Sequence, residues 1–148
     1  VDSLVRVKDI NESYGKQWPD QVRIPLGRRA RSVGFLGSTI FGRGDDVNAG
    51  EDPIARYVFH YQDGSSVEEP VRWRRDAVDW YRNSLGDLRS LGWFDRGPSG
   101  NDGPFSAASF SEKIWRNPHP EKVITSIDFV SAKIAAAPFL LGVTVIEE

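Results

Sequence analysis

The stretch YVFHYQDGSSVEEPVRW, residues 57–73, decides the fold, because two runs rich in aromatic and β-branched residues flank a turn with a glycine. A two-residue loop at 63–64 would pair Phe59 with Glu68 and so place a charge opposite an apolar side chain. A three-residue loop at 62–64, with Gly64 in the left-handed conformation, avoids this conflict. The stretch therefore predicts a β-hairpin with a three-residue loop.

This loop also determines which side chains the hairpin buries. The predicted pairs are Phe59 with Val67, Tyr57 with Glu69, and Ala55 with Val71. The face towards the core then carries Ala55, Tyr57, Phe59, Val67 and Val71. The outer face carries Arg56, Val58, His60, Ser66 and Glu68.

Short strand patterns of the same kind recur along the chain between clusters of Gly, Pro, Asn and Asp. They predict strands at 31–39, 54–61, 65–73, 110–115, 123–131 and 139–147. Only residues 75–92 hint at a helix, and because Gly86 interrupts that pattern we expect one or two short helical turns there. Many short strands separated by turns predict an all-β fold, an antiparallel sandwich or barrel.

The last two strand patterns favour a sandwich that closes on itself. In the first, Val123, Thr125, Ile127 and Phe129 are expected to share the buried face, with Ser126 and Asp128 facing outward. In the second, the expected buried set is Phe139, Leu141, Val143 and Val145.

Composition narrows the classes of function. With 148 residues, 39% hydrophobic, a single domain over 1–148 with its own core is expected. A formal net charge of -2 provides no broad basic field for nucleic acid, and no apolar run reaches the roughly 20 residues of a membrane span. The absence of Cys excludes disulfides and thiolate metal sites. Because the chain lacks an initiator Met, we expect it to be part of a larger protein.

Four segments, in order, carry a resemblance to a known family: YVFHYQDGSSVEEPV at 57–71, DWY at 79–81, WRNPHPEKVITSIDFVSA at 115–132 and APFLLGVTV at 137–145. Together they resemble the galactose-binding-like jelly-roll β-sandwich domains appended to bacterial carbohydrate-active and surface proteins. Relatives often carry His after the dipeptide FL, where this chain has Gly37. The resemblance implies a secreted, extracellular, cell-surface or periplasmic accessory domain, usually non-catalytic, that binds a glycan through loops at one end. It also implies a structural calcium in some members.

Aromatic and arginine side chains gather in the segment after the hairpin. Sugar rings stack on indole and phenol rings, and arginine hydrogen-bonds their hydroxyls, so the candidate ligand-binding residues are Trp73, Arg75, Trp80, Tyr81, Trp93 and Arg96. Trp93 is expected in an exposed loop at 91–100. Burial of the tryptophans in the core and ordinary solvation of the arginines are the competing interpretations.

A glycine-rich loop at 42–52 supplies oxygen ligands of the kind that calcium prefers, from Asp45, Asp46, Asn48 and Asp52. The spacing differs from that of an EF-hand loop, and an ordinary polar loop is the alternative.

Catalysis finds little support in the sequence. The only histidines are His60, in the middle of a predicted strand, and His119, between two prolines, and no phosphate-binding glycine loop is present. The sequence thus predicts a non-catalytic module that binds a polysaccharide or glycan. The alternative is a structural domain without glycan affinity that packs against a catalytic or surface partner.

Overall fold

The computed structural model describes residues 5–7, 18–40, 53–73, 75–78, 80, 91–96 and 107–147, with the backbone alone for 91–96 and 107–109. These residues form nine β-strands, and none of them builds a helix long and apolar enough to cross a membrane. The strands are β1 Val5–Arg6, β2 Gln21–Arg28, β3 Ser32–Ile40, β4 Pro53–Tyr61, β5 Ser66–Arg72, β6 Leu91–Arg96, β7 Ala107–Arg116, β8 Ile124–Ser131 and β9 Ala137–Ile146.

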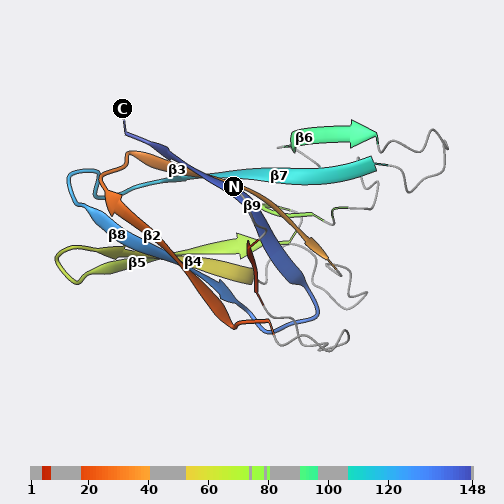
Figure 1. Cartoon of the computed structure of the whole chain (residues 1–148), viewed down its shortest axis with the longest axis horizontal. Helices are drawn as coiled ribbons and strands as arrows, with labels where there is room; N and C mark the ends of the chain where they lie inside the picture. The colour runs from red at the N-terminus through yellow and green to blue at the C-terminus, as the bar shows by residue number, and fades with distance from the viewer. Residues whose placement is uncertain are drawn as a thin grey trace.

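Two antiparallel sheets pack face to face, with strand orders β1-β9-β3-β7-β6 and β2-β8-β4-β5 (Figure 1). Apart from β6, the ladders β4·β5, β3·β7, β2·β8 and β1·β9 are those of one long hairpin folded over on itself. This nesting is the strand order of a jelly roll. The predicted antiparallel β-sandwich is therefore confirmed.

The hairpin between β4 and β5 has the predicted register. Phe59 pairs with Val67 and Tyr57 with Glu69, and Gly64 has a φ of 84°. Phe59 and Tyr57 are 0% and 3% exposed. The three-residue loop and the assignment of the two faces are therefore confirmed.

Stacked aromatic rings join the two sheets in the core. The ring centroids of Phe59 and Trp115 are 3.5 Å apart, and those of Phe35 and Tyr57 are 3.8 Å apart. Phe129, from the same sheet as Tyr57, stacks on Tyr57 with the ring centroids 5.3 Å apart. The first two contacts each join a strand of one sheet to a strand of the other, so they fix the packing of the sandwich.

Two β-bulges correct the predicted core. In β8, His60 pairs with Ser126 and Tyr61 with Ile124, so the intervening Thr125 is the extra residue and Ile124, 0% exposed, enters the core. In β9, Leu36 pairs with Gly142 and Gly37 with Leu140. The residue between them, Leu141, is the extra residue of the bulge. The core therefore contains Leu140, which is 3% exposed, in place of the predicted Leu141.

The segment 91–96 corrects a second expectation. It was expected to end a helical pattern and begin an exposed loop, but it forms strand β6 on β7. Leu91 pairs with Ser111 and Trp93 with Phe110, so Gly92 is the extra residue of a bulge. Aromatic residues favour a strand here despite the glycine.

Candidate functional site

The segment after Trp73 turns back onto the end of β3. The turn is held because Asp76 Oδ2 accepts a 2.8 Å hydrogen bond from the Arg72 N–H, while the Asp76 N–H donates to the Arg72 carbonyl at 2.9 Å. Further on, Thr39 N–H donates to the Val78 carbonyl at 3.0 Å. Trp80 N–H donates to the Thr39 carbonyl at 3.1 Å. The backbone of Trp80 is thus fixed to β3.

Trp80 is 40% exposed, an unusual value for so large an apolar residue. Arg75, on the same turn, is also exposed. The backbone of β6 belongs to the same end of the sandwich, since Ser111 pairs both with Gly37 of β3 and with Leu91 of β6. Among the described side chains, this end therefore presents the exposed indole of Trp80 and the exposed guanidinium of Arg75 on fixed backbone.

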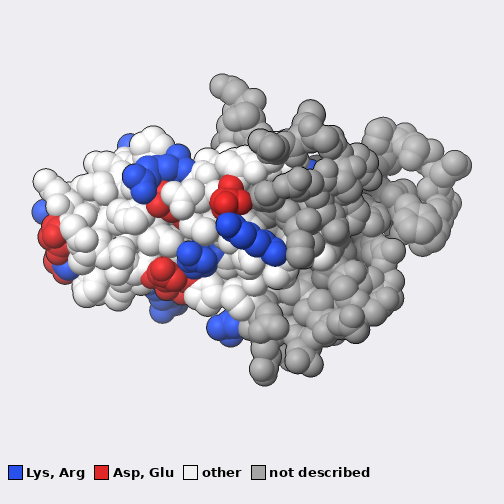
Figure 2. All heavy atoms as spheres, turned by 90° about the horizontal axis from the view of Figure 1, so that it is seen from below, with Lys and Arg blue, Asp and Glu red and all other residues white. Residues whose placement is uncertain are grey.

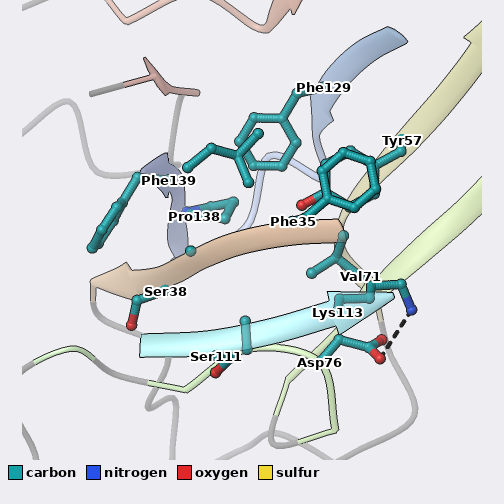
Figure 3. A pocket seen from close by; sticks show the side chains of 13 residues that line it. Phe35, Ser38, Tyr57, Val71, Asp76, Ser111, Lys113, Phe129, Pro138 and Phe139 are labelled. Atoms are coloured by element: carbon teal, nitrogen blue, oxygen red, sulfur yellow. Dashed lines mark ion pairs between the residues drawn. The ribbon is translucent and has the colours of Figure 1, made fainter. Parts of the chain in front are cut away.

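A partly buried ion cluster lies beneath this turn, and Figure 3 draws its pair between Lys113 and Asp76. Lys113 Nζ is 2.8 Å from Glu69 Oε1 and 2.9 Å from Asp76 Oδ1, and the side chains of Lys113 and Asp76 are only 12% and 10% exposed. Lys113 comes from β7 and Glu69 from β5, so the cluster ties the two sheets and the turn together. Removal of one member of such a buried pair leaves an uncompensated charge.

A cavity of about 10 Å³ adjoins the cluster, close to the minimum that a single water molecule needs. Figure 3 shows the side chains of Tyr57, Ser38, Ser111, Phe129 and Phe139 around it. Burial, with a smaller contribution from the charge of Asp76, raises the pKa of the Tyr57 hydroxyl above its usual range. The cavity is too small for a sugar ring, so a glycan at this end would bind on the surface.

The predicted ligand-binding residues fall into three groups. Arg75 and Trp80 are exposed, as described above. Trp73 is 8% exposed and belongs to the core, where its backbone bridges to Ala77, which agrees with the competing interpretation of a buried tryptophan. The backbone of Trp93 and Arg96 belongs to β6, and Tyr81 lies outside the described residues.

The predicted calcium ligands Asp45, Asp46, Asn48 and Asp52 also lie outside the described residues. Among the residues that the structure describes, no group of three or more His, Cys, Asp or Glu side chains is placed to hold a metal ion.

Sequence reasoning missed a polar cluster on the outer face of the four-stranded sheet. Arg23 donates from Nε to Asp128 Oδ1 at 2.7 Å and from its terminal nitrogen to Oδ2 at 2.8 Å. His60 Nε2 lies 2.8 Å from the same Oδ2. Asp128 does face outward, as expected, yet it is only 4% exposed because these two side chains cover it.

This cluster holds the carboxylate in its charged form. The hydrogen bond from Arg23 is the main cause that lowers the pKa of Asp128 to about 2; burial opposes it, and the contact with His60 adds to it. Figure 2, seen from this side of the molecule, shows basic and acidic side chains interspersed over the described surface. The described part of this face therefore offers no continuous basic patch to a polyanion.

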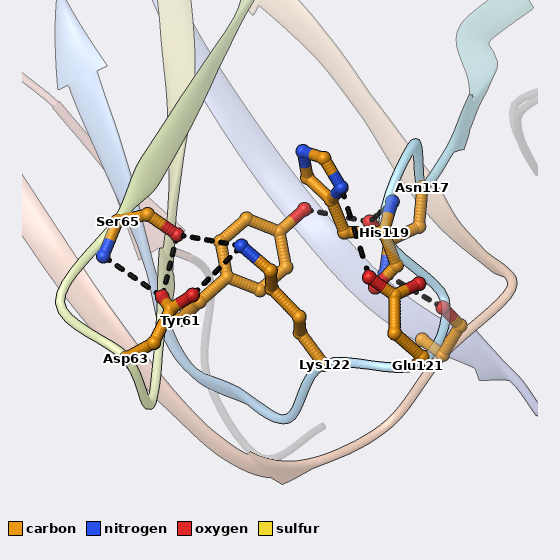
Figure 4. Close-up of polar contacts among 8 residues, drawn as sticks. Tyr61, Asp63, Ser65, Asn117, His119, Glu121 and Lys122 are labelled. Carbon is orange, nitrogen blue, oxygen red and sulfur yellow. Dashed lines mark hydrogen bonds and ion pairs between the residues drawn. The ribbon is translucent and has the colours of Figure 1, made fainter.

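The end of the sandwich at the hairpin loop carries a second polar network (Figure 4). Tyr61 donates its hydroxyl proton to Asn117 Oδ1 at 2.6 Å, and Asn117 Nδ2 donates to the Ala30 carbonyl at 2.8 Å. Lys122 Nζ pairs with Asp63 Oδ2 at 2.7 Å, and this hydrogen bond is the main cause that lowers the Asp63 pKa. These contacts join the loops at this end and indicate a structural role.

A scan against protein-family models finds no match for this chain, and searches of curated proteins and of solved structures find no similar protein.

Proposed function

We propose that this domain is a non-catalytic carbohydrate-binding module that holds a larger protein at a polysaccharide, with Trp80 as the stacking platform. The observation that carries the proposal is the 40% exposure of Trp80 on backbone that hydrogen bonds fix to β3. A rigid indole loses little conformational entropy when a flat sugar face stacks on it. Such a platform is therefore pre-organised for ligand binding.

Arg75 supplies the polar component of the proposed site. An exposed guanidinium donates several hydrogen bonds in a fixed planar geometry, which suits ring hydroxyls and, still better, the carboxylates or sulfates of acidic polysaccharides. Tyr81, Trp93 and Arg96 belong to the proposed site through the sequence pattern alone. The sequence resemblance to galactose-binding-like jelly-roll domains, an extracellular location and a calcium ion held by residues 45–52 are parts of the same proposal.

A different surface supports the alternative function, that of a structural module that packs against a partner. Ile114 is 55% exposed on the outer face of the five-stranded sheet, far more than expected for an isoleucine that serves only the core.

Binding to a panel of neutral, acidic and sulfated polysaccharides tests the proposal, with the Trp80→Ala and Trp80→Phe variants measured beside the unmodified domain. For the polysaccharide that the unmodified domain binds, we expect Trp80→Ala to abolish binding. We expect Trp80→Phe to keep part of the binding, because the smaller ring still presents an aromatic face. Thermal unfolding of both variants controls for the fold. Unchanged binding by Trp80→Ala would contradict the proposed site. If the unmodified domain bound none of the polysaccharides, the result would favour the structural alternative.

A further inference from the structure

The outer face of strands β9, β3 and β7 combines exposed isoleucines with glycines. Ile114 is 55% exposed and Ile146 is 40% exposed. A Cβ atom placed on Gly142 would meet no other atom within 4 Å, so open space lies above this residue. We call this surface the glycine face, and its nine positions are Ser32, Gly34, Leu36, Glu112, Ile114, Arg116, Gly142, Thr144 and Ile146.

The strand register arranges these positions in three rows across the sheet. The first row contains Ile146, Ser32 and Arg116; the central row contains Thr144, Gly34 and Ile114; and the third row contains Gly142, Leu36 and Glu112. The bulge at residue 141 determines which residues of β9 face outward. Beyond the bulge, Val143 and Val145 pack on the core, so Gly142, Thr144 and Ile146 face outward.

The two charges of the glycine face do not pair with each other within one molecule. Glu112 and Arg116 are four residues apart on β7, a separation of about 14 Å in an extended strand. Neither forms an ion pair with another of the described residues. A second surface with the opposite charge at each of these two positions would therefore pair with both.

A second copy of the same face supplies that surface. A two-fold axis along the central row exchanges the first and third rows, which places Ile146 of one copy over the open space above Gly142 of the other. The same axis places Arg116 over Glu112 and brings the two Ile114 side chains together. We propose that the glycine face is a contact between two copies of this chain, stacked with their strands antiparallel. Each surface is complementary to itself, as a two-fold interface requires.

The geometry of stacked sheets is compatible with these contacts. Sheets pack about 10 Å apart with their strands rotated by about 30°. The outer rows lie about 7 Å from the axis, so this rotation displaces them by about 3.5 Å. Arginine and glutamate side chains are long and flexible enough to span this shift.

The size of the surface sets the expected strength of the contact. Three strands about 4.8 Å apart and five residues about 3.4 Å apart cover roughly 250 Å². A stable interface buries about 800 Å² on each partner, so we expect a weak, concentration-dependent dimer.

Charge reversal tests the two-fold arrangement in the whole chain. Sedimentation velocity over a wide range of protein concentration compares the unmodified domain with Glu112→Arg, Arg116→Glu and the double variant. Each single reversal opposes like charges twice in the dimer, so we expect association to weaken about tenfold or more. The double variant restores both ion pairs and is expected to regain the original association constant.

A monomer at every concentration, or a double variant that associates no better than either single variant, would overturn the proposal. Association unaffected by every variant would do so as well, since it would place the contact elsewhere. Thermal unfolding of each variant verifies the fold. The outcome is separable from glycan binding, because Trp80 lies outside the glycine face and none of these substitutions changes it.

Discussion

Replacement of Asp128 by Asn is expected to lower the free energy of unfolding by about 2 kcal/mol at neutral pH. The carboxylate is 4% exposed and receives two hydrogen bonds from Arg23, which lower its pKa from 3.8 to about 2. A shift of nearly two units corresponds to about 2.5 kcal/mol, at about 1.4 kcal/mol for each unit. Because the Arg23 side chain is 60% exposed, solvent screening reduces this to about 2 kcal/mol. Asn keeps the shape of the side chain but loses the charge, so it forfeits this stabilisation.

The pH dependence has a definite sign. Because the pKa of Asp128 is lower in the folded than in the unfolded state, the stabilisation is fully present above about pH 4. It is lost as the pH falls from there through about 2, where the folded carboxyl takes up its proton. Urea unfolding of both proteins at a series of pH values therefore gives curves that converge in acid.

Glu68→Gln is the matched control, since Glu68 lies on the same face of the sheet but is 62% exposed in its pair with Arg56. An exposed pair contributes about 0–1 kcal/mol, so the control is expected to change stability little. Equal stability of Asp128→Asn and the unmodified domain at neutral pH, or parallel curves down to acid pH, would refute the reasoning.

Two further substitutions test the packing. A Cβ atom at Gly37 would clash with the Phe139 carbonyl oxygen, so Gly37→Ala must displace β9 and is expected to cost about 1–3 kcal/mol in chemical denaturation. Gly142→Ala, in open space and measured in dilute solution, is its control, and an equal cost for both would contradict the steric explanation. Tyr61→Phe removes the hydrogen bond to Asn117 and is expected to cost about 1 kcal/mol. A more stable variant would show that this bond does not support the loops.

The hairpin was predictable because its information is local. Of the two loop lengths compared, only the three-residue loop avoids setting Glu68 opposite Phe59, and this condition gives the observed register of β4 on β5. The bulges in β8 and β9 were not predictable in the same way. Each changes the phase of a strand by one residue, and its position depends on the neighbouring strands and not on the local alternation of apolar residues.

Strand β2 was not predicted, because Pro25 and Gly27 interrupt its alternation of polar and apolar residues and both residue types are unfavourable inside a strand. In the structure β2 is an edge strand, where a proline without an N–H is tolerated. The omission had a consequence for the polar cluster, because Arg23 belongs to β2 and contacts Asp128, which is 105 residues away in sequence. A pattern read along the chain gives no indication of such a pair.

The candidate site was predictable in outline, and its division into core and surface was not. The sequence grouped Trp73 and Trp80 because both follow the hairpin, and only the turn organised by Asp76 separates them, burying Trp73 and exposing Trp80. Residue type alone could not decide between these two environments.

The most direct test of the proposed function is a titration of the isotope-labelled domain with an oligosaccharide from the polysaccharide that it retains, followed by nuclear magnetic resonance. We predict that the indole N–H of Trp80 and the backbone amides of Thr39, Trp80 and Arg75 shift together with one dissociation constant. Shifts confined to another face of the sandwich, with the Trp80 signals unmoved at saturation, would contradict the account.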